Sequence, residues 1–192
     1  MRTHAMLLVC LVSVMHGAAR ADTPSDAPPA GAPAVVVVAP ADGFRLRHGI
    51  DATFGDEFGT GSLSGFSGAL GGIDWRIGAQ INNALAAYLD THLSLGTAQM
   101  NGASGVTGNF AVAAMGEYTI LDHFFVAGGG GYGVLNNPSG PMLQARGGWY
   151  PVVSKSRVGP RRRGLMIGFD VREYFVGANV TQLSLSVGYE KY

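Results

Sequence analysis

The sequence predicts an all-β protein, an eight-stranded antiparallel up-and-down transmembrane β-barrel. From residue 44 onward, apolar and polar residues alternate with a period of two, the period of a strand with two unlike faces. Charged residues make up 14% of the chain, against roughly 25% in ordinary soluble domains. The best apolar run, Ala5 to Met15, is too short for a membrane-spanning helix. Strands, and not helices, are therefore the elements expected to cross a membrane.

The first 43 residues divide into two segments that precede the alternation. Residues 1–21 have the layout of a secretory signal peptide, with Arg2, an apolar run and the cleavage site Ala19-Arg20-Ala21. Cys10, the only cysteine, lies within it, so the mature chain is expected to have no disulfide and no thiol chemistry. Five prolines fall within residues 22–43, which predicts a flexible tether. The barrel is then expected to span residues 44–192.

Eight alternating segments follow one another along the barrel. They are predicted at 44–54, 65–79, 84–96, 108–120, 124–134, 142–150, 165–174 and 181–190. The segment 124–134 is apolar or Gly on both faces, so its phase stays open. Most connections alternate between long and tight. The long ones are expected at 55–64, 97–107 and 135–141, and the tight ones at 80–83 and 121–123, while 151–164 is long where a tight turn would fit the pattern.

The charges on the polar faces indicate which face points inward. They comprise five arginines and five carboxylates, with no lysine. Arginine suits a confined interior, because its planar guanidinium pairs with carboxylates, and an arginine facing lipid costs about 2–4 kcal/mol near the midplane. An eight-stranded barrel has an interior just filled by side chains. We therefore predict an interior charge network made of Arg45, Arg47, Asp51, Asp74, Arg76, Asp90, Glu117, Arg146, Asp170 and Arg172.

The aromatic residues are expected to form two girdles, one at each edge of the membrane. Every Phe, Tyr and Trp of the barrel segments lies near a predicted strand end or loop, except Tyr88 and Phe169. Aromatic side chains gather at both interfaces of outer-membrane barrels. His48 falls on the lipid-facing side of the first strand, and the pattern offers no reason for it beyond a local bulge.

The chain from Phe44 to Tyr192 resembles the small eight-stranded outer-membrane proteins: the transmembrane domain of outer-membrane protein A, outer-membrane protein X and the opacity-type adhesins. The resemblance rests on the signal peptide, the strand count and the final strand Leu183 to Tyr192. It implies a location in the outer membrane among its lipids, and assembly by the barrel-assembly machinery. In that family an aromatic residue at the end of the last strand is the assembly signal. Tyr189 and Tyr192 are the candidates here, although Tyr192 is out of phase with Tyr189.

The expected function is a structural or surface-interaction role, without catalysis or a cofactor. The zero net charge gives no long-range attraction for nucleic acid, and we expect a monomer. Three alternatives remain open. They are a narrow channel for small solutes, a lipid A-modifying barrel enzyme, and a soluble periplasmic barrel that binds an apolar ligand.

The enzyme alternative rests on Asp90, His92 and Ser94, which share one strand face. Same-face neighbours on a strand are about 6.6–7 Å apart, so no direct hydrogen bond between His92 and Ser94 is expected. His92-Leu93-Ser94 is also similar to the H-x-S motif of lipid A deacylases, but Leu95 stands where that family has Asn.

Two other features of the sequence are not assigned to a functional site. No Cys/His cluster has metal-ligand spacing. The connection before the seventh strand is basic and is interpreted as a solvated turn, with binding of anionic lipid headgroups as the alternative. Its basic residues are Lys155, Arg157, Arg161, Arg162 and Arg163.

Overall fold

The computed structural model describes residues 44–155 and 162–191. The predicted signal peptide, the predicted tether, Arg157, Arg161 and Tyr192 lie outside the described residues. The side chains of Lys155, Arg162 and Arg163 are likewise not described.

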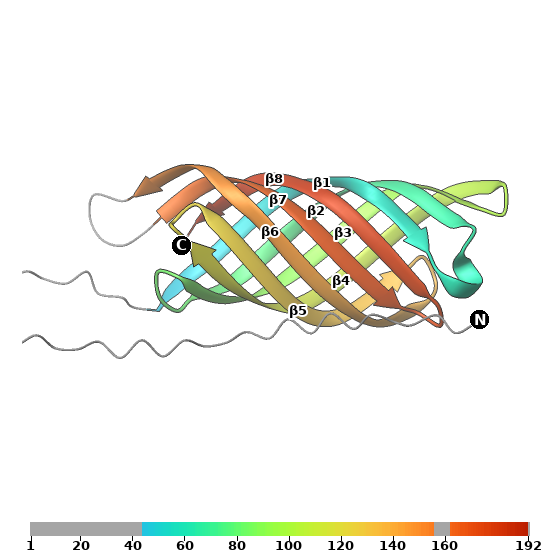
Figure 1. Cartoon of the computed structure of the whole chain (residues 1–192), viewed down its shortest axis with the longest axis horizontal. Helices are drawn as coiled ribbons and strands as arrows, with labels where there is room; N and C mark the ends of the chain where they lie inside the picture. The colour runs from blue at the N-terminus through green and yellow to red at the C-terminus, as the bar shows by residue number, and fades with distance from the viewer. Residues whose placement is uncertain (1–43, 156–161, 192) are drawn as a thin grey trace, which may run out of the picture. The chain divides into compact units, whose positions relative to one another are not determined.

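The described residues form one closed barrel of eight strands, in which each strand pairs antiparallel with the next and β8 pairs with β1 (Figure 1). The predicted fold class is confirmed. The chain enters β1 and leaves β8 at the same end of the barrel, here named the terminal end; the opposite end is named the far end. The strands are β1 Arg45–Gly59, β2 Phe66–Gln80, β3 Leu85–Met100, β4 Ala103–Ile120, β5 Phe124–Leu135, β6 Ser139–Lys155, β7 Arg162–Phe175 and β8 Asn179–Lys191.

The strands are longer than predicted, mainly at the far end. The predicted loop 97–107 is wrong, because β3 and β4 pair up to Met100 and Ala103. Asn101 (φ 51°) and Gly102 (φ 84°) form the whole turn; positive φ at both positions marks the type I′ hairpin turn that Asn-Gly favours. The predicted loop 55–64 is also too long, since β1 reaches Gly59 and a short 3-10 helix, η1 (Gly61–Leu63), follows. The long connection 151–164 shrinks in the same way, to residues 156–161.

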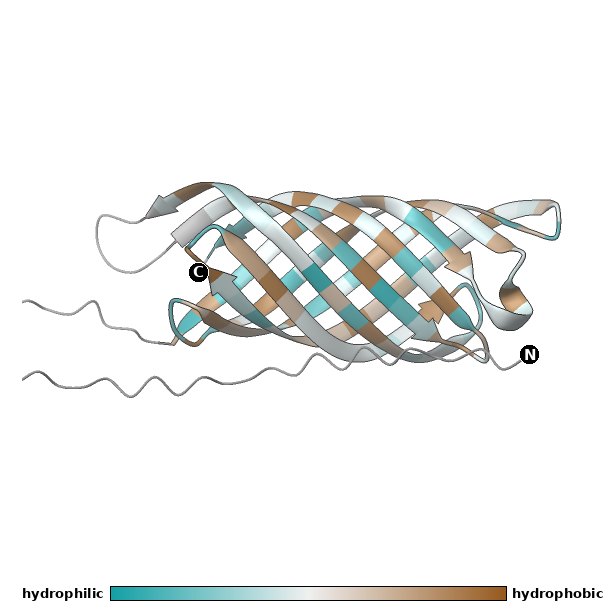
Figure 2. Ribbon diagram, viewed as in Figure 1, coloured by the Kyte–Doolittle hydropathy of each residue, from teal (hydrophilic) through white to brown (hydrophobic). Residues whose placement is uncertain are grey.

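Apolar side chains point outward and charged ones inward. Figure 2 shows the corresponding alternation of hydrophobic and hydrophilic residues along the strands. Ile50 and Leu89 are 55% and 51% exposed, whereas Arg76 and Asp170 are fully buried in the lumen. On β3 the outward residues from Leu85 to Leu95 are apolar except Thr91. Ten residue steps at about 3.3 Å, tilted by about 40°, give an apolar belt about 25 Å tall, which matches an outer-membrane bilayer. A soluble barrel that binds an apolar ligand would have the reverse arrangement.

Among the described residues, no helix has the length and apolar character needed to span a membrane.

Three aromatics assigned to the girdles are buried in the lumen instead, and a fourth, Phe66, is half-buried and packs against an interior cluster. Phe125, Tyr150 and Tyr174 are fully buried inside the barrel. Phe125 and Tyr150 pack with ring centroids 5.2 Å apart and form an interior cluster with Met166. Each of the three buried aromatics is adjacent in sequence to an outward-facing aromatic. The girdle prediction used only nearness to a strand end, which does not tell an inward side chain from an outward one. The outward aromatics include Phe44, Phe54, Trp75, Phe110, Tyr118, Phe124, Tyr132, Trp149, Phe175 and Tyr189.

A register shift in β6 explains the irregular sequence around Pro151. The pairing of β6 with β7 is regular to Trp149 and resumes at Val152. Proline has no backbone N–H, so it is tolerated at such a bulge and not in a regular central strand. No bulge occurs at His48, which faces outward in unbroken register with Ile77 of β2.

The phase of β5, left open by its sequence, is fixed by close backbone packing of alternate glycines. A Cβ added to Gly131 would lie 1.9 Å from the carbonyl oxygen of Val112, whereas one added to Gly128 would meet nothing nearer than 3.9 Å. We expect Gly131→Ala to lower the free energy of unfolding by about 1–3 kcal/mol through overpacking. Gly128→Ala should change it by less than about 0.5 kcal/mol. Urea unfolding of both variants in lipid vesicles checks this, and equal effects would contradict the assigned packing.

Candidate functional site

The lumen near the terminal end is held together by Arg47. Its Nη2 lies 2.6 Å from Glu117 Oε1 on β4 and 2.6 Å from Glu190 Oε2 on β8. The guanidinium also stacks over the Tyr88 ring at 5.2 Å and donates to the Tyr150 hydroxyl oxygen at 3.0 Å. Strands β1, β3, β4, β6 and β8 thus meet at one cation, which crosses the barrel from wall to wall.

Two further arginines continue the network toward the middle of the lumen. Arg76 Nε donates to Glu190 Oε1 at 2.8 Å, and its Nη1 lies 2.5 Å from Asp51 Oδ1. Arg146 reaches the other oxygen of Asp51 at 3.5 Å and Asp170 at 3.3 Å. Every side chain in this chain of contacts is fully buried, so each charge is balanced by its neighbours and not by water.

Arg172 holds the next group of carboxylates. Its Nη2 lies 2.8 Å from Asp74, 3.6 Å from Asp90 and 3.8 Å from Asp170. Oxygens of these three aspartates lie within 4.8 Å of one another, close enough to share a cation. The guanidinium of Arg172 contacts all three, so the protein supplies that positive charge from its own side chain.

His92 joins this group through Asp74 and also contacts Ser94, a contact that was not expected from the sequence. His92 Nδ1 is hydrogen-bonded to Asp74 Oδ1, and His92 Nε2 lies 3.0 Å from Ser94 Oγ. The expectation that His92 and Ser94 are too far apart is therefore wrong, because the imidazole ring extends along the strand toward the hydroxyl. The acid next to His92 is Asp74 from β2 and not Asp90.

Asp74, His92 and Ser94 have the order of contacts of a catalytic triad, but not its accessibility. Ser94 is only 1% exposed, so its hydroxyl is enclosed by the lumen. Gln182 Nε2 also lies 3.0 Å from His92 Nε2, on the nitrogen that would have to accept the serine proton. In this arrangement the three residues, together with Gln182, connect β2, β3 and β8 as part of the lumen filling.

The structure brings together nine of the ten residues predicted for the interior network. Arg45 is the exception: it is half-buried at the start of β1, and its Nη2 donates to Asn83 Oδ1 in the β2–β3 turn at 3.0 Å. Glu190 was missed, although it has the same parity as the inward residues Gln182, Ser184 and Ser186 of its strand. Of the two candidate assembly-signal residues, Tyr189 faces outward on β8 and Tyr192 lies outside the described residues.

The part of the lumen nearer the far end is mostly apolar. A cluster that includes Leu135, Met142, Tyr174 and Val180 fills it. Glu57, also missed by the sequence analysis, is buried in this half and accepts a hydrogen bond from Asn109 Nδ2 at 2.8 Å. The predicted first strand ended at Phe54, which placed Glu57 in a loop. Buried side chains of both the charged network and the apolar clusters thus fill the lumen along the described strands.

These features define the fold class as that of the small eight-stranded outer-membrane β-barrels, which confirms the resemblance predicted from the sequence. Among solved structures, the chain is similar to Ail, the attachment invasion locus protein of Yersinia pestis, solved in complex with the heparin analogue sucrose octasulfate. The TM-score is 0.54 at 13% identity, over 78% of this chain and 99% of that chain. It is also similar to the outer-membrane protein OprG of Pseudomonas aeruginosa, with a TM-score of 0.49 at 10% identity, over 78% of this chain and 96% of that chain. No protein-family model and no curated protein matches the chain. At 13% identity, the likeness to Ail shows the fold alone.

Proposed function

We propose that the protein is a monomeric outer-membrane β-barrel with a sealed lumen, which acts without catalysis in a structural or surface-interaction role. The apolar belt supports insertion into a bilayer, since side chains such as Ile50, Leu89 and Val187 face outward around the ring. The closed hydrogen-bonded ring supports a monomer, because no strand edge within the belt needs a partner.

The observation that carries the proposal is the burial of four paired arginines in the lumen. Arg47, Arg76, Arg146 and Arg172 are fully buried, and each contacts at least two carboxylates of other strands. A water-filled pore would leave such side chains solvated. With the interior closed, the surfaces left to contact other molecules are the outer wall and the two ends.

The far end is proposed to face the outside of the cell. Apolar side chains continue to the turns at the terminal end, as Leu121 in the β4–β5 turn shows with 82% exposure. At the far end the strands extend beyond the belt, and outward residues become polar at positions such as Asp56 and Thr97. Outer-membrane barrels place short turns on the periplasmic side and their larger projections outside.

The part of the far end best suited to a surface interaction is the projecting edge of β4. Residues 103–107 pair with β3, but the pairing of β4 with β5 begins only at Asn109. Val106 in this segment is 79% exposed. An unpaired strand edge presents backbone N–H and C=O groups to which an extended segment of another protein can add.

Planar-bilayer recording tests the sealed lumen. We expect the refolded protein to give no stepwise conductance, because no continuous water path passes the arginine contacts. A heat-modifiability gel of the same sample verifies that folded barrels are present. Reproducible single-channel steps from a heat-modifiable sample would overturn the sealed barrel in favour of the narrow channel.

A further inference from the structure

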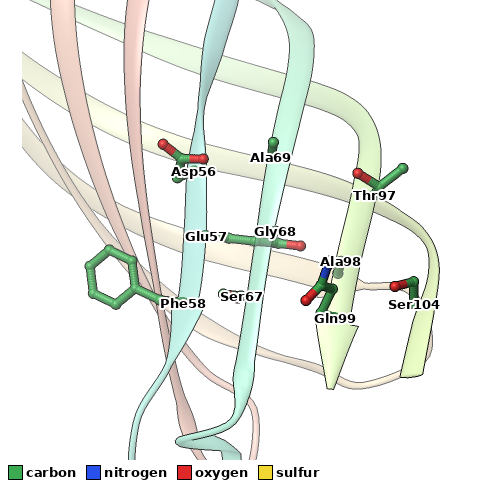
Figure 3. Close-up of a pocket in the computed structure, with 10 residues that line it drawn as sticks. All are labelled: Asp56, Glu57, Phe58, Ser67, Gly68, Ala69, Thr97, Ala98, Gln99 and Ser104. Carbon is green, nitrogen blue, oxygen red and sulfur yellow. The ribbon is translucent and has the colours of Figure 1, made fainter. Parts of the chain in front are cut away.

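The outer wall of the far end contains a hollow of about 650 Å³ over β1 to β4 (Figure 3). Its floor includes Ser67 on β2, flanked by Asp56 and Phe58 on β1 and by Thr97 and Gln99 on β3. All five side chains are exposed, while the residues that alternate with them are buried or half-buried toward the lumen. The hollow therefore opens outside the barrel and is separate from the interior network.

The exposed side chains that line the hollow are mostly polar and include one carboxylate, Asp56, and no cation; the other carboxylate of the lining, Glu57, is buried. The hollow offers the Asp56 carboxylate, the Gln99 amide and the hydroxyls of Ser67, Thr97 and Ser104. None of these five side chains is hydrogen-bonded to another side chain or backbone group among the described residues, whereas the polar groups of the lumen bond extensively to one another. Their donors and acceptors are free to bind a ligand.

This set of groups fits a sugar better than the other ligands available at a membrane surface. Carboxylate, amide and hydroxyl groups exchange hydrogen bonds with vicinal sugar hydroxyls, and the exposed Phe58 ring provides an apolar face for sugar C–H groups. A phosphate would find no lysine or arginine and would be repelled by Asp56. An acyl chain would leave the polar groups without hydrogen bonds.

The position of the hollow indicates where that sugar comes from. Phe54 on β1 and Leu95 on β3 are exposed apolar residues of the belt. Asp56 and Thr97, each two residues farther along the same strands, belong to the hollow. Two residues span about 7 Å along a strand, so the hollow lies beyond the acyl chains, and Phe58 and Gln99 lie one further such step away from them.

We propose that this hollow binds uncharged sugar units in the headgroup of a glycolipid of the outer leaflet. The inference rests on the proposed function in one respect, namely that the far end faces outward. It adds a ligand class and a site on the outer wall.

Glycolipid retention in nanodiscs tests the site. The barrel is reconstituted into phospholipid nanodiscs with lipopolysaccharide that carries its full core sugars, or with the same lipid lacking them. After mild detergent extraction, native mass spectrometry measures the glycolipid that stays bound. We expect the wild-type protein to retain the full-core form about tenfold better, and Ser67→Ala combined with Gln99→Ala to remove that preference, as the loss of two hydrogen bonds implies.

Controls separate this site from general effects. Ser139→Ala alters an exposed hydroxyl at the far end of β6, outside the hollow, and should retain the wild-type preference. Ala69→Trp, which fills the floor of the hollow, should abolish the preference by steric exclusion. Retention that ignores the core sugars, or that survives both hollow variants, overturns the proposal. So does soluble core oligosaccharide that binds as tightly as the glycolipid, because the source would then be a free glycan. A wild-type protein that fails to insert, seen as loss of heat modifiability, overturns the proposed function itself.

Discussion

Glu190→Gln is expected to lower the free energy of unfolding by about 3–5 kcal/mol, the cost of breaking a buried ion pair. Glu190 accepts from Arg47 Nη2 at 2.6 Å and from Arg76 Nε at 2.8 Å. The amide keeps the shape of the side chain but removes the charge, so two guanidinium groups lose their shared carboxylate inside the lumen. Urea unfolding in lipid vesicles, followed by the fluorescence of Trp75 and Trp149, measures the change.

Glu173→Gln is the matched control for this prediction. Glu173 lies outward on β7 and is only half-buried, with Thr181 Oγ1 donating to it at 2.5 Å. Because solvent screens its charge, the variant should change the free energy of unfolding by less than about 1 kcal/mol. Equal destabilisation by the two variants would mean that the lumen is wet and that the network is not a dry ion-pair cluster.

Leu89→Arg is expected to destabilise the inserted barrel by about 2–4 kcal/mol, the cost of an arginine facing lipid near the midplane. Leu89 is 51% exposed and lies inside the apolar belt of β3, between Ala87 and Leu93 on the same face. The backbone and the lumen are untouched by this substitution, so the change reports the environment outside the wall. Reversible unfolding from phospholipid vesicles provides the measurement.

Thr181→Arg places the same side chain on the outer wall beyond the belt. Thr181 faces outward at the far end of β8, opposite Phe58 of β1. We expect a cost of about 0–1 kcal/mol, the value near a membrane interface. If Leu89→Arg were tolerated as well as Thr181→Arg, the belt would not contact acyl chains, and the membrane location would be wrong.

The strands and their inward faces were predictable because a strand with two unlike environments shows a period of two. The strand ends were not predictable, because β1 and β3 continue beyond the apolar belt, where outward residues such as Asp56 and Thr97 are polar. Hydrophobic alternation therefore records the height of the belt and not the length of the strand. Asn101-Gly102 did carry a local signal, since this dipeptide favours a two-residue hairpin, and it would have shortened the predicted 97–107 loop.

Which residues face the lumen was predictable from their parity along each strand, but which of them contact one another was not. Arg47 and Glu117 are 70 residues apart, and their contact depends on how eight strands close into a ring. The prediction that His92 and Ser94 do not touch was wrong for a different reason. The strand repeat fixes the distance between backbone positions, but the long His92 side chain brings its Nε2 to 3.0 Å from Ser94 Oγ. Tyr150 has the same parity as the inward Gln144 and Arg146, so parity could have placed it in the lumen, whereas the apolar and Gly-rich sequence of β5 gives no such guide for Phe125.

The pairing of β1 with β8 has a consequence for the order of assembly. Arg47 and Arg76 lie on the first two strands. The carboxylate that they share belongs to Glu190, the penultimate residue of the last strand. Until that strand docks, both guanidinium groups lack this counter-charge and the seam between β1 and β8 is open. Docking of the final strand therefore closes the hydrogen-bonded wall and supplies the carboxylate shared by Arg47 and Arg76 at the same time.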